Sequence, residues 1–396
     1  MITYVFIQRD FLLGGIETLI LRTIPSVLQS GARVVVCGSH ADMIGQLPDE
    51  VMAIDVKNEM AACWRIPAFL KANGLVGNVH LVSFNPWSLV VAFITRFVFR
   101  AMGFPCVRSF YLIPHSRAMF FSGGKLAKLF LRNIFLRAPK QSTYFMNDVT
   151  LEAHENEWKR SLAEWPILRL PVGETNSNWQ PKNDGVLKIV SVGRIVPFKD
   201  YNRAAPDIAA SLIRAGLDVC WTIWGHGEDE EIVNKFISER GVKGSVKLMG
   251  SLPYSRLEQE IIQHDVFIGM GTALLEASLA GMPTICALEN GRGAGYGFMT
   301  ETPSDSIGDL KAGYATEPLV DTLQRFAAMS ADDRKILAQA CSKEASARGV
   351  SLASFVAALD GAALWPARLR PSDLFYALTG IIALGFRETV FAIKYR

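Results

Sequence analysis

The stretch Gly193-Arg194-Ile195-Val196-Pro197-Phe198-Lys199 decides the fold of one half of the chain. It follows the apolar run Leu187–Val192, which predicts a buried strand that ends in a loop. Two fixed positive charges, Arg194 and Lys199, stand five residues apart in that loop. Arginine offers phosphate oxygens a planar fork, and lysine adds a point charge. The stretch therefore predicts a binding site for a diphosphate at the carboxyl end of a strand.

A second stretch, Gly269-Met270-Gly271-Thr272-Ala273-Leu274-Leu275-Glu276, follows the short apolar strand Val266–Ile268. Its glycines let a ligand approach the backbone, and the free N–H groups of a helix that begins near Thr272 attract an anion. Glu276 lies one helical turn later, where its carboxylate can accept hydrogen bonds from ribose hydroxyls. The two stretches together predict a nucleotide-sugar site.

Short apolar strands alternate with helices through both halves of the 396 residues. This alternation predicts an α/β fold with two parallel, doubly wound sheets. We expect a first Rossmann-like domain at 1–175, a polar linker at 176–185 and a second domain at 186–371. Two such domains facing each other would place both sets of strand carboxyl ends on one cleft.

With these motifs the chain resembles the GT-B glycosyltransferases of family 4. In that family a Gly-Arg pair and a lysine five residues later hold the donor diphosphate. The glutamate of a Leu-Glu-Ala-x-x-x-Gly-x-Pro helix, here Leu275–Pro283, holds the ribose. Further matching segments are Gly14-Gly15-Ile16-Glu17, Gly225-His226-Gly227 and Asp265-Val266-Phe267.

The resemblance implies a GT-B fold in which a C-terminal helix at 372–396 packs back on the first domain. It implies transfer of a sugar from a nucleotide diphosphate to an acceptor with retention, in surface polysaccharide assembly. The implied catalytic residues are Arg194, Lys199 and His115. The implied donor-binding residues are Gly14, Gly15, Gly193, His226, Gly269, Met270, Gly271, Thr272, Ala273 and Glu276.

The chain departs from the family at one position. The family carries a second glutamate eight residues before the ribose-binding one, where it contacts the donor sugar, and here that residue is Ile268. Two alternatives therefore stay open. One is a non-hydrolysing sugar-nucleotide epimerase on the same fold, and the other is a catalytically silent nucleotide-sugar-binding subunit.

Several motifs are absent from the sequence. There is no Asp-x-Asp, no Gly-x-Gly-x-x-Gly with an acidic partner and no P-loop, which disfavours metal–diphosphate, NAD and P-loop NTPase chemistry. We expect no cofactor and no metal, because Arg194 and Lys199 can neutralise the diphosphate themselves. The glycine-rich segment 291–297 predicts a mobile flap in which Arg292 is a further phosphate-binding candidate.

Charge is distributed unevenly. The 88 residues between Glu59 and Asp148 include eleven basic residues and no acidic one. Lys125, Lys128 and Arg132 fall on one arc of a predicted helix, which is typical of an element that lies on an anionic membrane. A core helix with a solvated basic face is the alternative, and a nucleic-acid surface is a third option that no binding motif accompanies.

From these patterns we expect a peripheral enzyme on the cytoplasmic face of the membrane. Its partners would be a nucleotide-sugar donor, a lipid-linked or glycolipid acceptor and the membrane surface, with no nucleic acid. The scattered cysteines and a first strand that begins at once, without a signal peptide, favour a reducing compartment.

Overall fold

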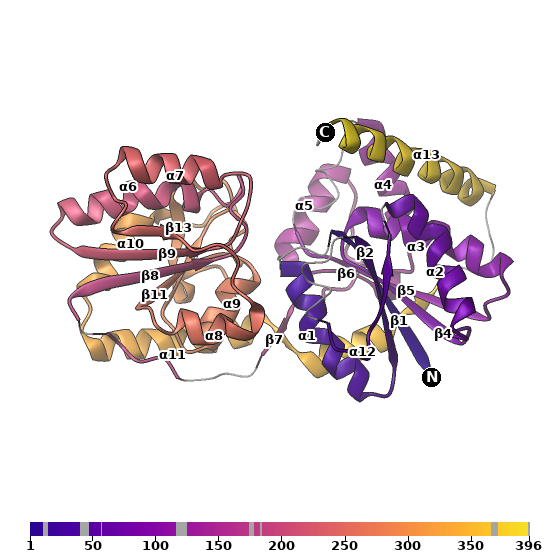
Figure 1. The fold of residues 1–396 in the computed structure, drawn as a ribbon, viewed down its shortest axis with the longest axis horizontal. Helices are drawn as coiled ribbons and strands as arrows, with labels where there is room; N and C mark the ends of the chain where they lie inside the picture. Colours follow the sequence, from indigo (N-terminus) through magenta and orange to yellow (C-terminus); the bar gives the residue numbers. More distant parts are fainter. Residues whose placement is uncertain are drawn as a thin grey trace. The chain divides into compact units, whose positions relative to one another are not determined.

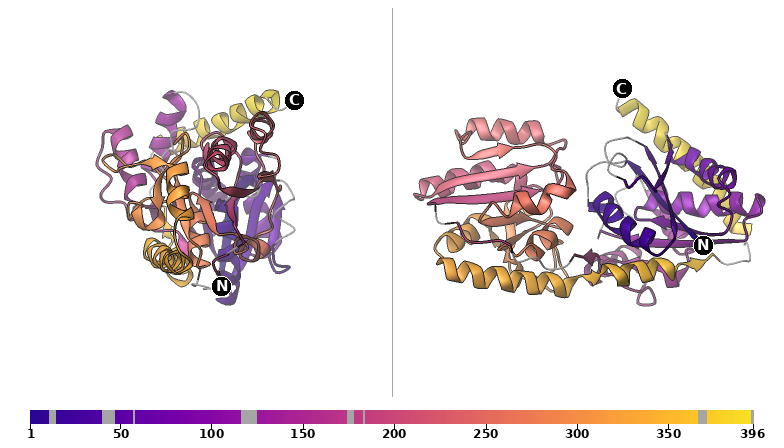
Figure 2. Two further views of the ribbon diagram at one scale, coloured as in Figure 1. Left: turned by 90° about the vertical axis from the view of Figure 1, so that its left-hand side faces the viewer. Right: turned by 60° about the horizontal axis from the view of Figure 1, so that its bottom comes forward.

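The computed structural model describes residues 1–10, 15–39, 47–56, 58–115, 125–173, 178–182, 184–365 and 371–394 (Figures 1 and 2). The chain forms two compact units. Unit 1 contains the first strand, Ile16–Arg169 and Leu352–Arg396, and unit 2 contains Gly15 and Leu170–Ser351. The sequence predicted the two α/β domains, and the structure confirms this fold class.

Unit 1 is built on a seven-stranded sheet in the order β16-β5-β4-β1-β2-β3, with β6 beside β5. Its pairs are parallel except for β16, which runs antiparallel to β5. The strands are β1 (Ile2–Asp10), β2 (Arg33–Ser39), β3 (Met52–Asp55), β4 (Asn78–Ser83), β5 (Cys106–Ile113), β6 (Thr143–Phe145) and β16 (Ala363–Leu364). The helices are α1 (Gly15–Gln29), α2 (Glu59–Ala72), α3 (Pro86–Ala101), α4 (Lys125–Phe135), α5 (Asp148–Trp158), α12 (Leu352–Asp360) and α13 (Pro371–Lys394).

Asparagine caps three helices of this unit shortly after a strand ends. The side chains of Asn58, Asn85 and Asn147 accept hydrogen bonds of 2.7–2.8 Å from backbone N–H groups three residues later. An asparagine cap satisfies one of the first-turn donors that a helix leaves unpaired. The caps therefore fix α2, α3 and α5 so that each begins at the carboxyl edge of the sheet.

Unit 2 is built on a second seven-stranded sheet in the order β10-β9-β8-β11-β12-β13-β14. The strands are β8 (Val186–Val192), β9 (Asp218–Trp224), β10 (Val246–Leu248), β11 (Val266–Gly269), β12 (Thr284–Ala287), β13 (Ala294–Phe298) and β14 (Glu317–Pro318). The helices are α6 (Tyr201–Arg214), α7 (Glu230–Glu239), α8 (Leu257–Ile261), α9 (Thr272–Leu279), α10 (Leu319–Ala327) and α11 (Ala331–Arg348). A separate short pair joins β7 (Pro171–Val172) to β15 (Val350–Ser351).

The predicted linker packs on unit 2 where it is described. The buried indole of Trp179 donates a 2.7 Å hydrogen bond to the carbonyl of His264. The buried carboxylate of Asp265 accepts bonds from the backbone N–H groups of Lys182 and Lys188. These contacts make residues 178–182 part of unit 2, whereas the sequence predicted a linker across 176–185.

The chain returns to unit 1 earlier than the sequence predicted. Residues from Leu352 already belong to unit 1, whereas we expected the second domain to run to residue 371. The reason is a set of polar contacts that local sequence does not reveal. Asp360 accepts a bond from the Tyr4 hydroxyl, and Arg108 donates to the carbonyl of Ala362 at 2.9 Å.

The last helix, α13, packs on α2, α3 and α4 of unit 1, as the resemblance implied. Asp373, in its first turn, forms ion pairs of 3.2 Å with Arg96 and Arg137. None of the helices in the described part of the chain has the length and hydropathy needed to cross a membrane.

Candidate functional site

The loop after β8 is fastened to the loop after β9 by backbone hydrogen bonds. Gly193 donates to Trp224 and Ile195 donates to His226, both at 2.9 Å. The N–H of Asp229 donates back to the carbonyl of Ile195 at 3.1 Å. Because Ile195 is fully buried, the loop has a fixed path, and this path determines where Arg194 and Lys199 stand.

The close approach of these loops explains why both neighbours of His226 are glycines. A Cβ on Gly225 would collide with the carbonyl oxygen of Gly193, and a Cβ on Gly227 would collide with that of Ile195. Both obstacles are backbone atoms, so a larger residue would displace the loop itself. The sequence signalled a loop at Gly225-His226-Gly227, but it did not show that the glycines serve Arg194 and Lys199.

The surroundings of Lys199 lower the pKa of its ammonium group strongly. Its ammonium lies 2.8 Å from the place where a Cβ on Gly193 would stand. Burial, and then the charge of Arg194, lower the pKa of Lys199 to about 8. Among the described residues neither cation forms an ion pair with a carboxylate. Two neighbouring cations without an anion suit a multiply charged anionic ligand.

The loop after β11 leads directly into α9. Gly271 has a φ of +71°, in the left-handed region that favours glycine, and it donates a 2.6 Å bond to Ile307. Thr272 and Ala273 begin the helix and are partly exposed, while the side chain of Met270 is buried. Only backbone groups of Met270 are thus available to a ligand. The first-turn N–H groups of α9 supply the positive end of a helix dipole.

Glu276 lies one turn into α9 and is partly exposed. The hydroxyl of Tyr254 points to its Oε1 from 3.5 Å, a distance at the outer limit of a hydrogen bond. This contact orients the carboxylate that the sequence assigned to ribose. Tyr254 was not among the predicted residues.

His226 contributes through its backbone. Its side chain is mostly exposed, and Nδ1 lies 2.9 Å from Oε2 of Glu230. A Cβ on Gly250 would lie 3.2 Å from Nε2. The carbonyl group of His226 thus helps to hold the loop after β8, and its place in the donor site stays a prediction.

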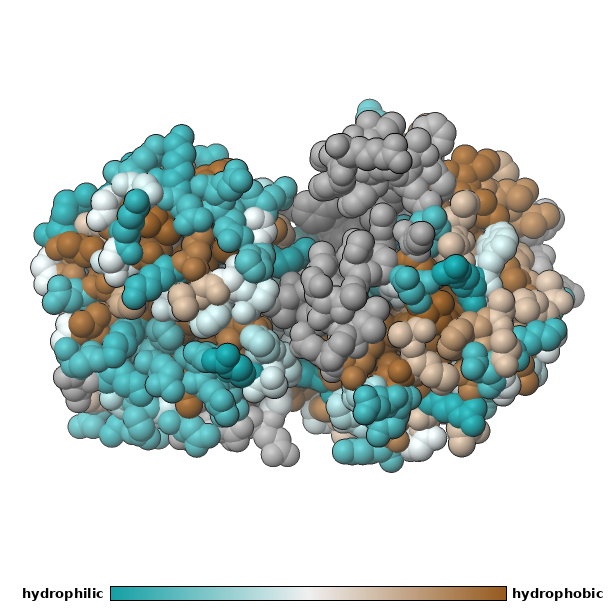
Figure 3. All heavy atoms as spheres, viewed as in Figure 1, coloured by the Kyte–Doolittle hydropathy of each residue, from teal (hydrophilic) through white to brown (hydrophobic). Residues whose placement is uncertain are grey.

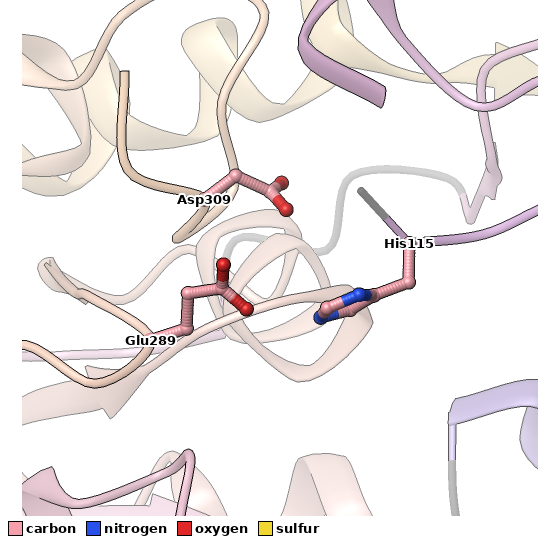
Figure 4. A group of neighbouring side chains, drawn as sticks. All are labelled: His115, Glu289 and Asp309. Carbon is pink, nitrogen blue, oxygen red and sulfur yellow. The ribbon is translucent and has the colours of Figure 1, made fainter. Parts of the chain in front are cut away.

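Glu289 and Asp309 form a pair of buried carboxylates that sequence analysis missed (Figure 4). Their carboxylate oxygens lie within 4.8 Å of one another. The loop before Asp309 also holds the α9 loop, since Ile307 accepts from Gly271 and Gly308 accepts from Glu289 at 2.9 Å. The two acids therefore lie next to the start of α9.

His115, Gly14 and Gly15 come from the first half of the chain. His115 follows β5, and Figure 4 draws its side chain. Burial, and to a smaller extent the charge of His115, lower the pKa of the nearby His154 to about 4. Gly15 is the first residue of α1. Gly14 lies outside the described residues.

One sequence-based expectation about the second half is wrong. Residues 294–298 form strand β13, which pairs with β12 and β14, so the segment 291–297 is not a mobile flap. Asp200 anchors the preceding turn by accepting a 2.8 Å bond from the N–H of Arg292. The side chain of Ile268, at the position where the family has its sugar-contacting glutamate, is fully buried in the core of unit 2.

The acid-free segment is less uniformly exposed than its sequence predicted. Arg96 is buried, and Arg96 and Arg137 point inward to Asp373. Lys128 pairs with Glu157 at 3.5 Å, and Lys140 pairs with Glu164. The acidic partners come from residues outside the segment, which a count of charges along the sequence does not reveal.

Residues 173–293 match the family described as Glycosyl transferases group 1. That range contains both loops, α9 and Glu276. The chain is a glycosyltransferase with the GT-B fold. No curated protein matches the sequence.

Solved structures that resemble this glycosyltransferase over its length share its fold at low identity. Anabaena Alr3699/HepE in complex with UDP-glucose has a TM-score of 0.65 and 13% identity, covering 91% of this chain and 98% of that chain. A mutant of S. aureus TarM in complex with UDP has a TM-score of 0.64 and 11% identity, covering 91% and 99%. WaaG, described as a glycosyltransferase involved in lipopolysaccharide biosynthesis, has a TM-score of 0.60 and 16% identity, covering 90% and 98%.

Proposed function

We propose that this glycosyltransferase moves a sugar from a nucleoside diphosphate sugar to a lipid-linked or glycolipid acceptor. The single observation that carries the donor half is the partly buried ammonium of Lys199 beside Arg194, with no carboxylate partner in the described chain. A buried cation without a counter-ion is costly, and a diphosphate would supply the missing charge.

The proposed chemistry follows from where charge develops. As the bond between the sugar and the diphosphate breaks, negative charge accumulates on the leaving phosphate. Arg194, Lys199 and the N-terminus of α9 stabilise that charge, because they are held in place before the reaction begins. We propose that no metal is needed, since these groups perform the neutralisation that a metal performs elsewhere. Glu276 accepts hydrogen bonds from the ribose hydroxyls.

Retention is part of the proposal. The diphosphate would leave from the face that the acceptor attacks, and one of its own oxygens would take the acceptor proton. No strong protein base is then required. The proton moves from the acceptor hydroxyl to the departing phosphate, and the new glycosidic bond forms on the same face.

We propose that Glu289 and Asp309 accept hydrogen bonds from the donor-sugar hydroxyls. Their place beside the start of α9 supports this role, as does the burial of Ile268 at the position where the family has its sugar-contacting acid. Glu289→Gln would lower turnover of the donor at saturation while leaving UDP affinity unchanged, because UDP carries no sugar. Equal turnover by the variant and the wild type would overturn this assignment.

The names of the similar structures support the choice of ligand and process. HepE was solved with UDP-glucose and TarM with UDP, so uridine diphosphate is the first ligand to test. WaaG is described as acting in lipopolysaccharide biosynthesis, which supports an acceptor at the membrane and a role in surface polysaccharide assembly.

Calorimetric titration with UDP, GDP, ADP and CMP tests the donor site. We expect one diphosphate to bind the wild type and not the Arg194→Ala/Lys199→Ala variant. Lys243→Ala/Lys247→Ala is the matched control, because it removes two exposed cations of the same unit. Unchanged affinity in the Arg194/Lys199 variant would refute the site.

A further inference from the structure

Helix α13 exposes a face that is entirely apolar. Between Ser372 and Leu384 the exposed residues are Leu374, Phe375, Leu378 and Ile382, each with more than half of its surface accessible. At 100° per residue they share one arc of about 100°. Figure 3 shows hydrophobic residues gathered where Figure 1 draws the first turns of this helix.

The opposite face of α13 is firmly seated on unit 1, which fixes what points outward. Gly380 packs so closely that a Cβ there would lie 3.1 Å from Ile94 of α3 and 3.3 Å from Phe130 of α4. Asp373 is held by both Arg96 and Arg137. The helix therefore cannot turn its exposed side chains inward without giving up these contacts.

Helix α4 adds to the same surface. It contacts α13 through Phe130, whose ring centroid lies 6.3 Å from that of Tyr376. Leu126 and Leu129 of α4 are 83% and 51% exposed. We call these two leucines and the four exposed residues of α13 the apolar face.

The charges around the apolar face are mostly basic, although α13 also contains Glu388 and Glu157 stands beside Lys128. Helices α3 and α4 contain no acidic residue, and Asp373 of α13 is buried in its ion pairs. Lys125 is exposed and Arg132 partly exposed, and neither has an ion pair among the described residues. Lys128 is the member of the α4 arc that pairs with an acid, Glu157.

We propose that the apolar face binds the surface of an anionic membrane, with Lys125 and Arg132 against the headgroups. Apolar side chains on a helix that lies in the interface enter the acyl boundary, and each nearby cation adds attraction to anionic lipid. A second copy of the chain fits less well, because a symmetric contact would bring the same cations together. The inference deepens the proposed function and rests on its membrane-bound acceptor.

Flotation of the full chain with vesicles tests the surface. Vesicles of pure phosphatidylcholine and vesicles containing phosphatidylglycerol would be compared at low and high salt. We expect the wild type to float with the anionic vesicles and Leu378→Glu/Ile382→Glu to lose at least about tenfold in partitioning. Lys125→Gln/Arg132→Gln would reduce binding to anionic vesicles alone.

Ile336→Glu is the matched control, because Ile336 is 65% exposed on α11 of unit 2. It should float like the wild type, and thermal melts of all variants show whether they are folded. Equal flotation of the Leu378/Ile382 variant and the wild type would overturn the proposal. So would a wild-type dimer that does not float and that this variant converts to a monomer. UDP calorimetry on the same samples reports separately on the donor site.

Discussion

Replacing Lys199 by methionine should weaken diphosphate binding and, at neutral pH, stabilise the ligand-free protein. Burial and the charge of Arg194 lower the pKa of Lys199 from 10.5 to about 8. This difference corresponds to about 3 kcal/mol, the most that the charged ammonium costs the folded state. Between pH 8 and 10.5 the unfolded chain binds more protons than the folded chain, so wild-type stability rises with pH across this window. Lys199→Met has no ammonium to bury, so its free energy of unfolding should exceed that of the wild type below pH 8. This difference should disappear towards pH 10.5.

The same pKa predicts a pH dependence of binding. A bound diphosphate raises the pKa of Lys199, so binding at pH 9 should take up about 0.9 proton, against about 0.1 at pH 7. Affinity should then fall by up to about tenfold for each pH unit above 8. Calorimetric titrations with UDP in buffers of different ionisation enthalpy measure the uptake directly.

Lys199→Met should abolish the proton uptake at pH 9, whereas Lys243→Met, at an exposed site of the same unit, should retain it. Thermal melts at pH 7 supply the second readout. A wild type that takes up no proton at pH 9, or a Lys199→Met variant that is less stable than the wild type at pH 7, would refute the reasoning. The first result would mean that Lys199 gains no proton when the diphosphate binds, and the second would mean that Lys199 stabilises the fold.

Three further changes test other parts of the structure. Gly227→Ala should lower UDP affinity at least about tenfold, because the new Cβ displaces the neighbouring loop. Gly244→Ala is the control, because its Cβ meets open space and should leave the affinity unchanged. Calorimetry with UDP compares the two variants. Asp373→Ala should lower the free energy of unfolding, measured with urea, by about 3–5 kcal/mol, because it leaves Arg96 buried without its carboxylate. A decrease below about 1 kcal/mol would contradict this role of Asp373. Ile268→Glu should lower the melting temperature and create no new donor turnover, because the new carboxylate is buried in the core; a stable variant with gained turnover would contradict this placement.

Local sequence predicted the elements that carry their own signal. A short apolar run predicts the strand before Gly193, and the glycines after a second apolar run predict the start of the helix at Thr272. Every feature in them depends on residues close in the chain. The strands at β8 and β11 and the start of α9 therefore lie where the sequence predicted them.

Features that depend on distant residues could not be predicted. Nothing near Arg96 indicates that Asp373, far along the chain, pairs with it, so local sequence does not predict the burial of Arg96. The glycine-rich segment 291–297 predicts a flap from its composition, and the pairing of β13 with β12 and β14 that contradicts this prediction depends on residues that the segment does not contain. The acids Glu289 and Asp309 belong to no motif, and only the fold brings them together.

Most of unit 1 is assembled from two distant parts of the chain, and Leu170–Ser351 of unit 2 is inserted between them. A ribosome therefore completes every strand of unit 2 before it makes α12, β16 and α13. Until those elements emerge, the nascent unit 1 lacks its antiparallel edge strand and leaves the apolar surface beneath α13 open to water. Apart from Gly15, unit 2 is contiguous in sequence, so residues 170–351 are the segment to express by itself. Unit 1 would need its late segment supplied, either in a circular permutant or as a second polypeptide.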